Sequence, residues 1–152
     1  MKTLFFIIFL GALGCICCAP NEENQSTEQQ LIIEDMKLKI TIGDIVLTAT
    51  LYDNPTSRDF ISMLPITTPL EDYASTEKIF YPERKLSTEG APSGFDPSVG
   101  DITYYAPWGD VAIFYKDFGH AKGLISMGRI DNDGIEQLRK LGKEAVTFEL
   151  LE

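Results

Sequence analysis

The sequence predicts a mainly β protein, a closed β-barrel of about eight strands with two short helices capping it. Runs of alternating apolar and polar residues recur along the chain, and prolines and glycines interrupt them at short intervals. Strand and helix patterns do not alternate regularly, as they would in a parallel α/β fold. Many short strands separated by turn residues therefore favour a sheet closed on itself.

Residues 1–14 predict a signal peptide. An almost unbroken apolar run follows Lys2 and covers residues 4–13. It has about half of the roughly 20 residues that a bilayer-spanning helix needs, which is typical of a signal peptide core.

Residues 15–31 are expected to form a lipidated N-terminus and a flexible linker. The order Ala12-Leu13-Gly14-Cys15 is similar to a bacterial lipobox. It predicts lipidation of Cys15 and an exported protein, held by its lipid anchor alone on the periplasmic or cell-surface face of a bacterial membrane. An ordinary signal cleaved near Ala19 is the alternative. Residues 21–30 contain no apolar residue and are typical of a spacer.

Composition excludes several classes of function. The formal net charge of −10 repels nucleic acid phosphates, so no nucleic acid partner is expected. The cysteines are confined to positions 15, 17 and 18, and His120 is the single histidine. We therefore predict no disulfide in the folded part, no His/Cys metal site and no cofactor.

Residues 32–152 are expected to form one domain. Its clearest local signal is a β-hairpin over residues 37–52, because apolar residues alternate with polar ones on both sides of Gly43-Asp44. Asn54 or Asp53 can then cap a helix whose first turn accepts Pro55. An apolar stripe ending at Leu64 and the following Pro65 place the end of this helix.

The rest of the chain continues with short strands. Residues 66–70 and 78–81 are strand-like, and their prolines place them at an edge or at strand ends. Residues 87–99 form a long loop, followed by strands at 101–106, 111–116 and 124–129. Helical spacing of Ile135, Leu138 and Leu141 predicts the second helix, and residues 145–151 alternate as a closing strand.

The order of these elements resembles a cyclophilin. The helix entry at residues 54–60 and the strand containing Gly128-Arg129-Ile130, followed by a helix entry at residues 133–138, are similar to that family. The motifs YYAPWG at 104–109, IFYKDFG at 113–119 and STEGAPSG at 87–94 resemble small bacterial cyclophilin-like domains. The resemblance spans residues 36–150 and implies a compact barrel without an established activity.

The chain departs from true prolyl isomerases at the positions that carry their chemistry. Arg84 is the only counterpart of the family's catalytic arginine, and its spacing is not matched. Alignment on Gly128 puts Leu124 where the family has its site histidine and Gly119 where it has its site tryptophan. The resemblance therefore implies that the barrel is retained while most of the isomerase machinery is absent.

Four residues are the candidates for a ligand groove, namely Trp108, Tyr81, Arg84 and Phe114. Trp108 lies in a turn between strands, where an indole can either stack on a ligand or plug one end of the barrel. Neighbouring residues on a strand face opposite ways, so one of each pair, Tyr104/Tyr105 and Phe114/Tyr115, is expected in the core.

Other titratable residues give weaker signals. Arg84 has a surface salt bridge to Glu83 or Glu89 as its alternative role. His120 is expected to be solvated in a loop. Glu71, Asp72 and Glu77 are a carboxylate cluster of a kind that arises by chance in so acidic a chain.

The sequence thus predicts a non-catalytic binding module for a peptide or small molecule. The alternative is a weak peptidyl-prolyl isomerase assisting protein folding, in which Arg84 would bond the prolyl nitrogen. A structural partner in a surface complex is a third class that the sequence leaves open.

Overall fold

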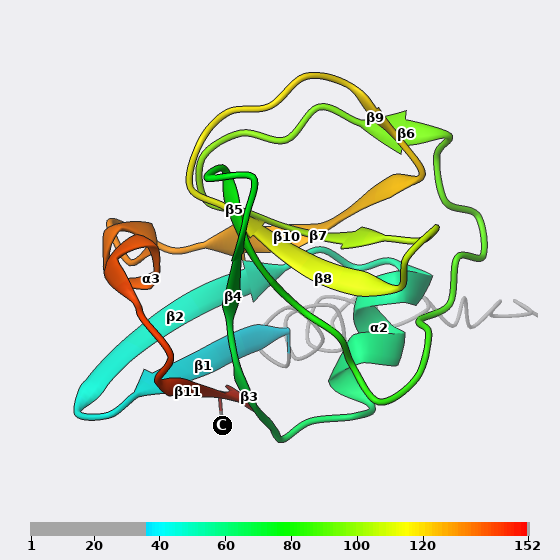
Figure 1. Ribbon diagram of the computed structural model, residues 1–152. Coiled ribbons are helices and arrows are strands. Elements are labelled where there is room, and N and C mark those ends of the chain that lie inside the picture. The colour runs from blue at the N-terminus through cyan, green and yellow to red at the C-terminus, as the bar shows by residue number, and fades with distance from the viewer. Residues whose placement is uncertain (1–35, 152) are drawn as a thin grey trace, which may run out of the picture.

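The computed structural model describes residues 36–151, so the predicted signal peptide, Cys15 and the whole predicted linker lie outside the described residues. Two short helices and a mainly antiparallel set of strands make up this part of the chain (Figure 1). In chain order the elements are β1 (Lys37–Ile42), β2 (Ile45–Leu51), α2 (Pro55–Ile61), β3 (Ile66–Pro69), β4 (Glu71–Tyr73), β5 (Glu77–Phe80), β6 (Gly94–Phe95), β7 (Asp101–Tyr105), β8 (Asp110–Phe114), β9 (Ala121–Lys122), β10 (Leu124–Ile130), α3 (Ile135–Lys140) and β11 (Ala145–Leu150).

Nine of the strands form one barrel-shaped sheet in the order β3-β11-β1-β2-β10-β7-β8-β5-β4. The two strands at the ends of this order, β3 and β4, are separated along the chain by Leu70 alone. One bent segment therefore pairs with β11 through its first half and with β5 through its second half. The ring is nearly closed in this way, and the predicted barrel of about eight strands is confirmed.

The first hairpin and the first helix form from their local sequence signals. Ile42 pairs with Ile45 across Gly43, whose φ of 55° is a conformation that suits glycine. The Asn54 side chain accepts a 2.9 Å hydrogen bond from the backbone of Ser57, as expected for a helix cap. α2 ends at Ile61, three residues before the predicted Leu64, because Ser62 is already its C-cap.

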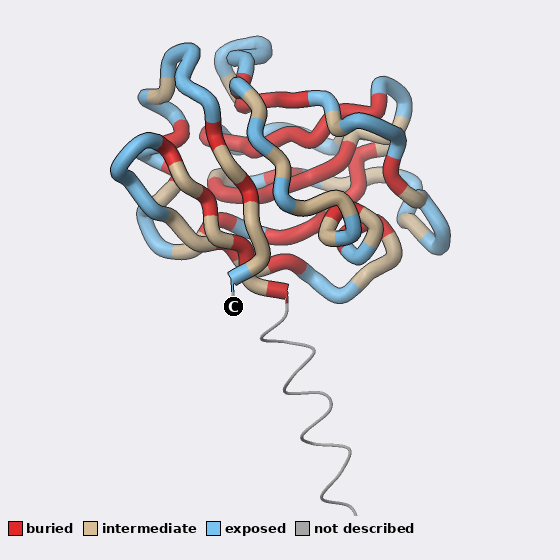
Figure 2. The backbone as a smooth tube through the Cα atoms, turned by 90° about the horizontal axis from the view of Figure 1, so that it is seen from below, coloured by how far each residue is buried: buried red, intermediate tan, exposed pale blue. Residues whose placement is uncertain are grey.

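The barrel has apolar side chains on both faces of one wall. In β8, Val111 and Ile113 point into the main core, whereas Ala112 and Phe114 belong to a smaller cluster on the outer face. Ile79 and Leu124 complete that outer cluster, and Phe95 and Ala121 from the β6–β9 pair pack against it. The buried strands of the barrel are seen as long red segments in Figure 2. A second apolar layer therefore covers the β5–β8–β7–β10 wall.

A charged cluster lies at the end of the barrel next to α3. Lys78 on β5 is 0% exposed, and its Nζ donates to Asp72 Oδ2 at 2.6 Å and to the Leu141 carbonyl at 2.7 Å. The Tyr115 hydroxyl donates to the other oxygen of Asp72 at 2.8 Å. Burial and this bond to a carboxylate raise the pKa of Tyr115 to about 12. The buried ammonium is thus fully paired, as a buried charge requires.

The helices of residues 36–151 are too short to cross a membrane.

Candidate ligand pocket

A pocket lies on the outer face of the β5–β8–β7–β10 wall, beneath the segment that carries β9. Its volume is about 450 Å³, within the range of small-molecule sites. The wall supplies the floor and the segment 118–122 supplies the roof, so the smaller apolar cluster and the pocket share residues. The lining residues are Tyr73, Glu77, Tyr105, Trp108, Asp110, Ala112, Phe114, Phe118, His120, Ala121, Lys122 and Leu124.

Three aromatic rings from three separate elements meet at one side of the pocket. Trp108 lies in the turn between β7 and β8, and its ring centroid is 5.5 Å from that of Tyr73 on β4 and 5.4 Å from that of Tyr105 on β7. Both tyrosine rings are nearly perpendicular to the indole, at 86° and 78°. Trp108 is 50% exposed, which excludes the alternative of a buried plug at a barrel end.

Two carboxylates also line the pocket. Asp110, the first residue of β8, is only 3% exposed, and its Oδ1 has no hydrogen-bond partner among the described residues. Burial raises the pKa of Asp110, and its own backbone N–H offsets this only in part. Burial also raises the pKa of Glu77 despite a 2.8 Å hydrogen bond from the Thr76 hydroxyl, and the negative charge of Asp110 adds to the rise.

Among the four predicted ligand residues, only Trp108 and Phe114 line this pocket. Phe114 is buried in the floor, while Tyr115 points into the main core, as the alternation predicted. The same split holds for Tyr105, which lines the pocket, and Tyr104, which is buried in the core. Tyr81 is exposed and lies in a separate hollow beside Met63 and Pro65.

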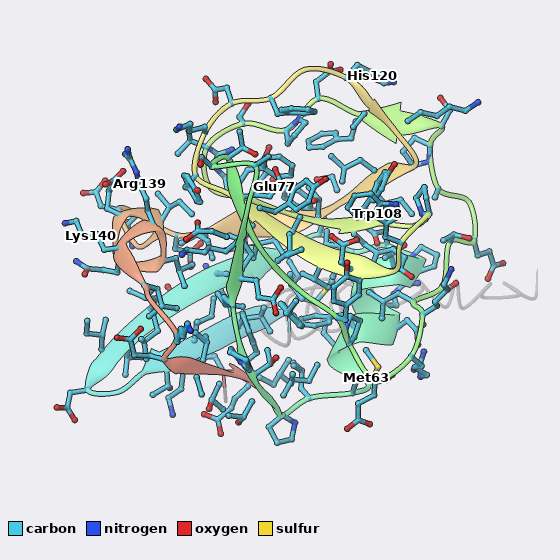
Figure 3. All side chains as sticks on the ribbon, in the orientation of Figure 1. Met63, Glu77, Trp108, His120, Arg139 and Lys140 are labelled. Atoms are coloured by element: carbon cyan, nitrogen blue, oxygen red, sulfur yellow. The ribbon has the colours of Figure 1, made fainter. Side chains whose placement is uncertain are left out.

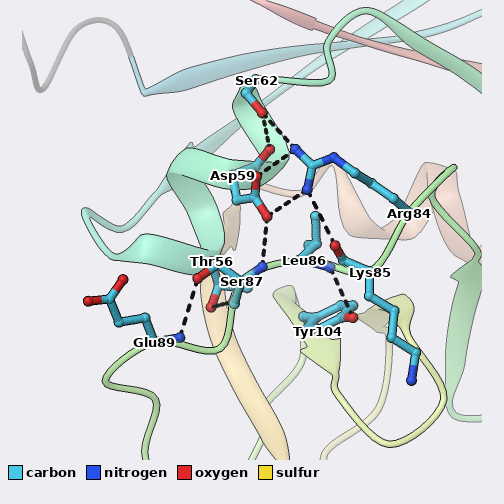
Figure 4. Close-up of polar contacts among 9 residues, drawn as sticks. All are labelled: Thr56, Asp59, Ser62, Arg84, Lys85, Leu86, Ser87, Glu89 and Tyr104. Carbon is cyan, nitrogen blue, oxygen red and sulfur yellow. Dashed lines mark hydrogen bonds and ion pairs between the residues drawn. The ribbon is translucent and has the colours of Figure 1, made fainter.

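Arg84 is also outside the pocket, where it fastens a loop to α2. Its two terminal nitrogens donate to both carboxylate oxygens of Asp59, at 2.8 and 2.6 Å (Figure 4). The backbone N–H of Ser87 donates to the same carboxylate at 2.7 Å. The hydrogen bond from Arg84 holds the pKa of Asp59 below its ordinary value. Arg84 therefore does form a surface salt bridge, but its partner is Asp59 and not the predicted Glu83 or Glu89, because the loop lies against α2.

His120 lies on the arch above Glu77 and Trp108 (Figure 3). Its exposed ring lies 3.1 Å from a carboxylate oxygen of Asp96. This contact joins the residue after β6 to the residue before β9, next to the pairing of these two strands. Over residues 36–151 no three His, Cys, Asp or Glu side chains are grouped so that they could hold a metal ion.

Comparison with protein families shows what this architecture is. A model described as the cyclophilin-like family matches residues 40–150, which is most of the chain. The chain belongs to the cyclophilin-like family. A search of the curated proteins finds none that matches this sequence.

A solved structure has the same kind of fold as this cyclophilin-like domain. The solution structure of the hypothetical protein AF2241 from Archaeoglobus fulgidus superposes with a TM-score of 0.58 at 22% identity. The match covers 77% of this chain and 95% of that one. At this identity the likeness concerns the fold alone.

Several pocket residues of the cyclophilin-like domain were not among the sequence candidates. Asp110 shares a face with Phe114, since residues two and four positions apart on a strand point the same way, so this signal was available. Tyr73 and Phe118 carried no comparable signal in the sequence. Tyr73 reaches Trp108 only through the position of β4 in the sheet. Phe118 reaches Phe114 in the floor only because segment 118–122 folds over the wall.

Proposed function

We propose that this cyclophilin-like domain is a non-catalytic binding module that holds a peptide side chain or a small organic molecule in the pocket beside Trp108. The observation that carries this proposal is a half-exposed tryptophan, flanked by two tyrosines, over a 450 Å³ pocket with an apolar floor. Aromatic side chains with a few placed polar groups are typical of such sites.

The contacts of Arg84 favour binding over catalysis. A prolyl isomerase needs a donor that stabilises the twisted amide more than the planar one. Arg84 is occupied by Asp59 and by Ser62, whose Oγ accepts from it at 3.1 Å. It is also absent from the pocket lining, and Leu124 stands at the position that the resemblance aligns with the family's site histidine.

The binding experiment uses Trp108, the only tryptophan of the chain, as its reporter. The purified domain is titrated with acetylated, amidated tripeptides whose central residue is basic, acidic, apolar or aromatic. We expect at least one to change the fluorescence saturably. Ala121→Phe, which fills the pocket from its roof, should abolish the change. Ala91→Phe, which fills a separate hollow beside α2, should leave it intact.

Two outcomes overturn the proposal. One is a fluorescence response that Ala121→Phe does not alter, because the ligand then binds elsewhere. The other is the absence of any saturable response both to the tripeptide set and to small organic molecules such as choline and its neutral counterpart. A coupled assay on an Ala-Pro peptide tests the isomerase alternative: turnover within about tenfold of a typical cyclophilin, or about 1.4 kcal/mol in the barrier, replaces the binding module by an enzyme.

The proposal includes an exported protein anchored to a bacterial membrane through a lipid on Cys15. Its support is the Ala12-Leu13-Gly14-Cys15 order after a short apolar run. This part is independent of the pocket and is tested separately below.

A further inference from the structure

The pocket carries an unpaired acidic group in its wall. Asp110 is buried, lines the pocket and leaves Oδ1 without a hydrogen-bond partner within residues 36–151. A buried carboxylate oxygen without a partner costs free energy, so such groups are rare in native proteins. Asp101, the other buried aspartate within residues 36–151, has partners for both oxygens, namely Arg129 at 2.7 Å and the backbone of Ser98 at 2.8 Å. Of these two buried aspartates, only Asp110 has an oxygen without a partner, and only Asp110 lines the pocket.

The remaining charges around the pocket leave its interior acidic. Glu77, a second carboxylate, is half-buried and also lines the cavity. The basic groups are Lys122 and His120, both exposed on the covering segment. No ion pair joins Lys122 or His120 to either carboxylate in the described part of the chain, and the ring of His120 is turned to Asp96. The pocket therefore presents two carboxylates that neither of its basic residues neutralises.

The aromatic side of the pocket has matching chemistry. The faces of aromatic rings carry negative potential and attract cations, and tryptophan does so most strongly. Several rings set at large angles to one another can surround a cation from different directions. Trp108, Tyr73 and Tyr105 have this arrangement. Tyr105 precedes Trp108 by three residues, whereas Tyr73 on β4 reaches them only in the folded barrel.

We propose that the pocket selects an organic cation, a substituted ammonium or guanidinium group, placed against the Trp108 ring and paired with the carboxylates of Asp110 and Glu77. This inference rests on the proposed binding function and specifies its ligand class. The cation supplies the partner that Asp110 lacks, and the apolar floor of Ala112, Phe114 and Leu124 accommodates the carbon substituents that it carries. The net charge of −10 also favours the approach of a cation over that of an anion.

Matched pairs of probes separate charge from shape. Choline is compared with 3,3-dimethyl-1-butanol, its neutral carbon counterpart, and acetyl-lysine methylamide with acetyl-norleucine methylamide. Binding is measured by calorimetry and by Trp108 fluorescence at constant ionic strength. We expect the cation of at least one pair to bind ten or more times tighter than its neutral partner. The choline pair and the lysine pair distinguish a free small molecule from a peptide side chain as the source of the cation.

Variants locate the effect. Asp110→Asn keeps the shape of the side chain and should weaken cation binding at least tenfold, and Glu77→Gln should weaken it to a smaller extent because Glu77 is more exposed. Glu149→Gln removes a charge on the distant strand β11 and should leave binding unchanged, which controls for the total charge of the protein. Melting curves confirm that each variant is folded before it is compared.

The outcomes distinguish this inference from the proposed function. If neutral and cationic partners bind equally and Ala121→Phe abolishes both, the cation inference is overturned while the binding module stands. The cation inference is also overturned, and the binding module again stands, if the cation binds but Asp110→Asn and Glu77→Gln leave its affinity unchanged. If neither these probes nor the tripeptide set bind, the proposed function itself fails.

Discussion

Trp108 is the residue whose environment best separates stability from function. Half of its surface is exposed, and its neighbours are the partly exposed Tyr73 and the pocket-lining Tyr105. The aromatic residues of the main core, by contrast, are buried: Phe60 packs against Phe80 and Phe148 at centroid distances of 6.3 and 6.4 Å.

Trp108→Ala should therefore lower the free energy of unfolding by only about 1 kcal/mol, whereas Phe60→Ala should lower it by about 3–5 kcal/mol, as core truncations do. Chemical denaturation followed by far-UV circular dichroism measures both values. A loss above about 3 kcal/mol for Trp108→Ala would show that the indole is a structural element of the wall.

The buried, unpaired carboxylate of Asp110 lowers the free energy of unfolding. Because burial raises the pKa of Asp110, keeping its carboxylate ionised costs more free energy in the folded protein than in the unfolded chain. Asp110→Asn should raise the free energy of unfolding at pH 7, by about 1 kcal/mol, while it weakens ligand binding.

The matched control is Asp101→Asn, which breaks the hydrogen-bonded ion pair between the buried Asp101 and the half-exposed Arg129 and should destabilise the protein. Urea denaturation of both variants checks the two signs. If Asp110→Asn destabilises as much as Asp101→Asn does, the carboxylate of Asp110 is held by the fold, and the explanation through a ligand loses its support.

At the scale of elements, the loop after β5 depends on α2 for its position. Asp59 on α2 accepts from Arg84 and from the Ser87 backbone, and Thr56 on the same helix donates to the Ser87 carbonyl at 2.7 Å. One residue before Ser87, the Leu86 backbone donates to the buried Tyr104 hydroxyl at 3.1 Å. The loop is thus tied both to the helix and to the barrel core.

Arg84→Ala should accelerate hydrogen exchange at the Ser87 amide, since the Asp59 carboxylate loses the contact that orients it. Exchange at the Leu86 amide should change less because Tyr104 holds it, and ligand binding should be unaffected. The control is Arg58→Ala. Arg58 lies on α2 beside Asp59, but it pairs with Asp53, so its loss should leave the Ser87 amide protected from exchange. Loss of ligand binding in Arg84→Ala would restore Arg84 to the candidate site.

Local signals predicted the elements that local physics determines. Alternation around Gly43 predicted the β1–β2 hairpin, and Asn54 with Pro55 predicted the start of α2. The two-residue strands β6 and β9 could not be predicted in this way. They pair only with each other, and they lie far apart in the sequence, so neither carries a local pattern that indicates a strand. The sequence therefore did not predict the roof of the pocket. It did predict one residue of the floor, Phe114, as a ligand contact.

Tyr81 illustrates the same limit within the candidate site. Tyr81 continues the alternation of Glu77 and Ile79, so a longer strand would place it on the face that carries the pocket. Pairing with β8 ends at Phe80, however, and Pro82 cannot extend it, so Tyr81 lies in a different hollow. Where a strand stops pairing depends on its partner, and the sequence of the strand alone does not contain that information.

At the scale of the whole molecule, two groups of carboxylates respond to pH in opposite directions. Glu77 and Asp110 have pKa values raised above 4.5 and 3.8, so the folded protein binds protons before the unfolded chain does. Asp59, Asp72 and Asp131 have pKa values below 3.8. For Asp72 the bond from Lys78 is the main cause, and for Asp131 the bonds from Thr50, Lys37 and Thr48 outweigh the effect of burial.

The free energy of unfolding should therefore rise as the pH falls from 7 toward about 5, and then decrease below about pH 4, where the unfolded chain binds more protons than the folded protein. Denaturation midpoints in urea across this range measure the profile. Combining Glu77→Gln with Asp110→Asn should flatten the rise and leave the acid limb in place. A steady decrease from pH 7 downward would contradict the assignment.

The predicted lipid anchor on Cys15 would determine where the whole protein is located. Cys15→Ala should abolish metabolic palmitate labelling and leave an uncleaved or soluble product, because no acyl chain then holds the protein on the membrane. Cys17→Ala is the control and should remain labelled. Labelling that persists in Cys15→Ala and disappears in Cys17→Ala would move the anchor to Cys17.

The position of β11 in the ring has a consequence for synthesis. Its residues pair with β1, at the start of the domain, and with β3, so the strand made last lies between two strands made early. Until residues 145–150 leave the ribosome, both β1 and β3 keep an unpaired edge, and such edges are where chains associate with one another. Barrel closure must then join segments from opposite ends of the domain, which makes folding slow compared with that of helical proteins. The nascent domain is thus most exposed to aggregation, and most dependent on chaperones, just before its final strand emerges.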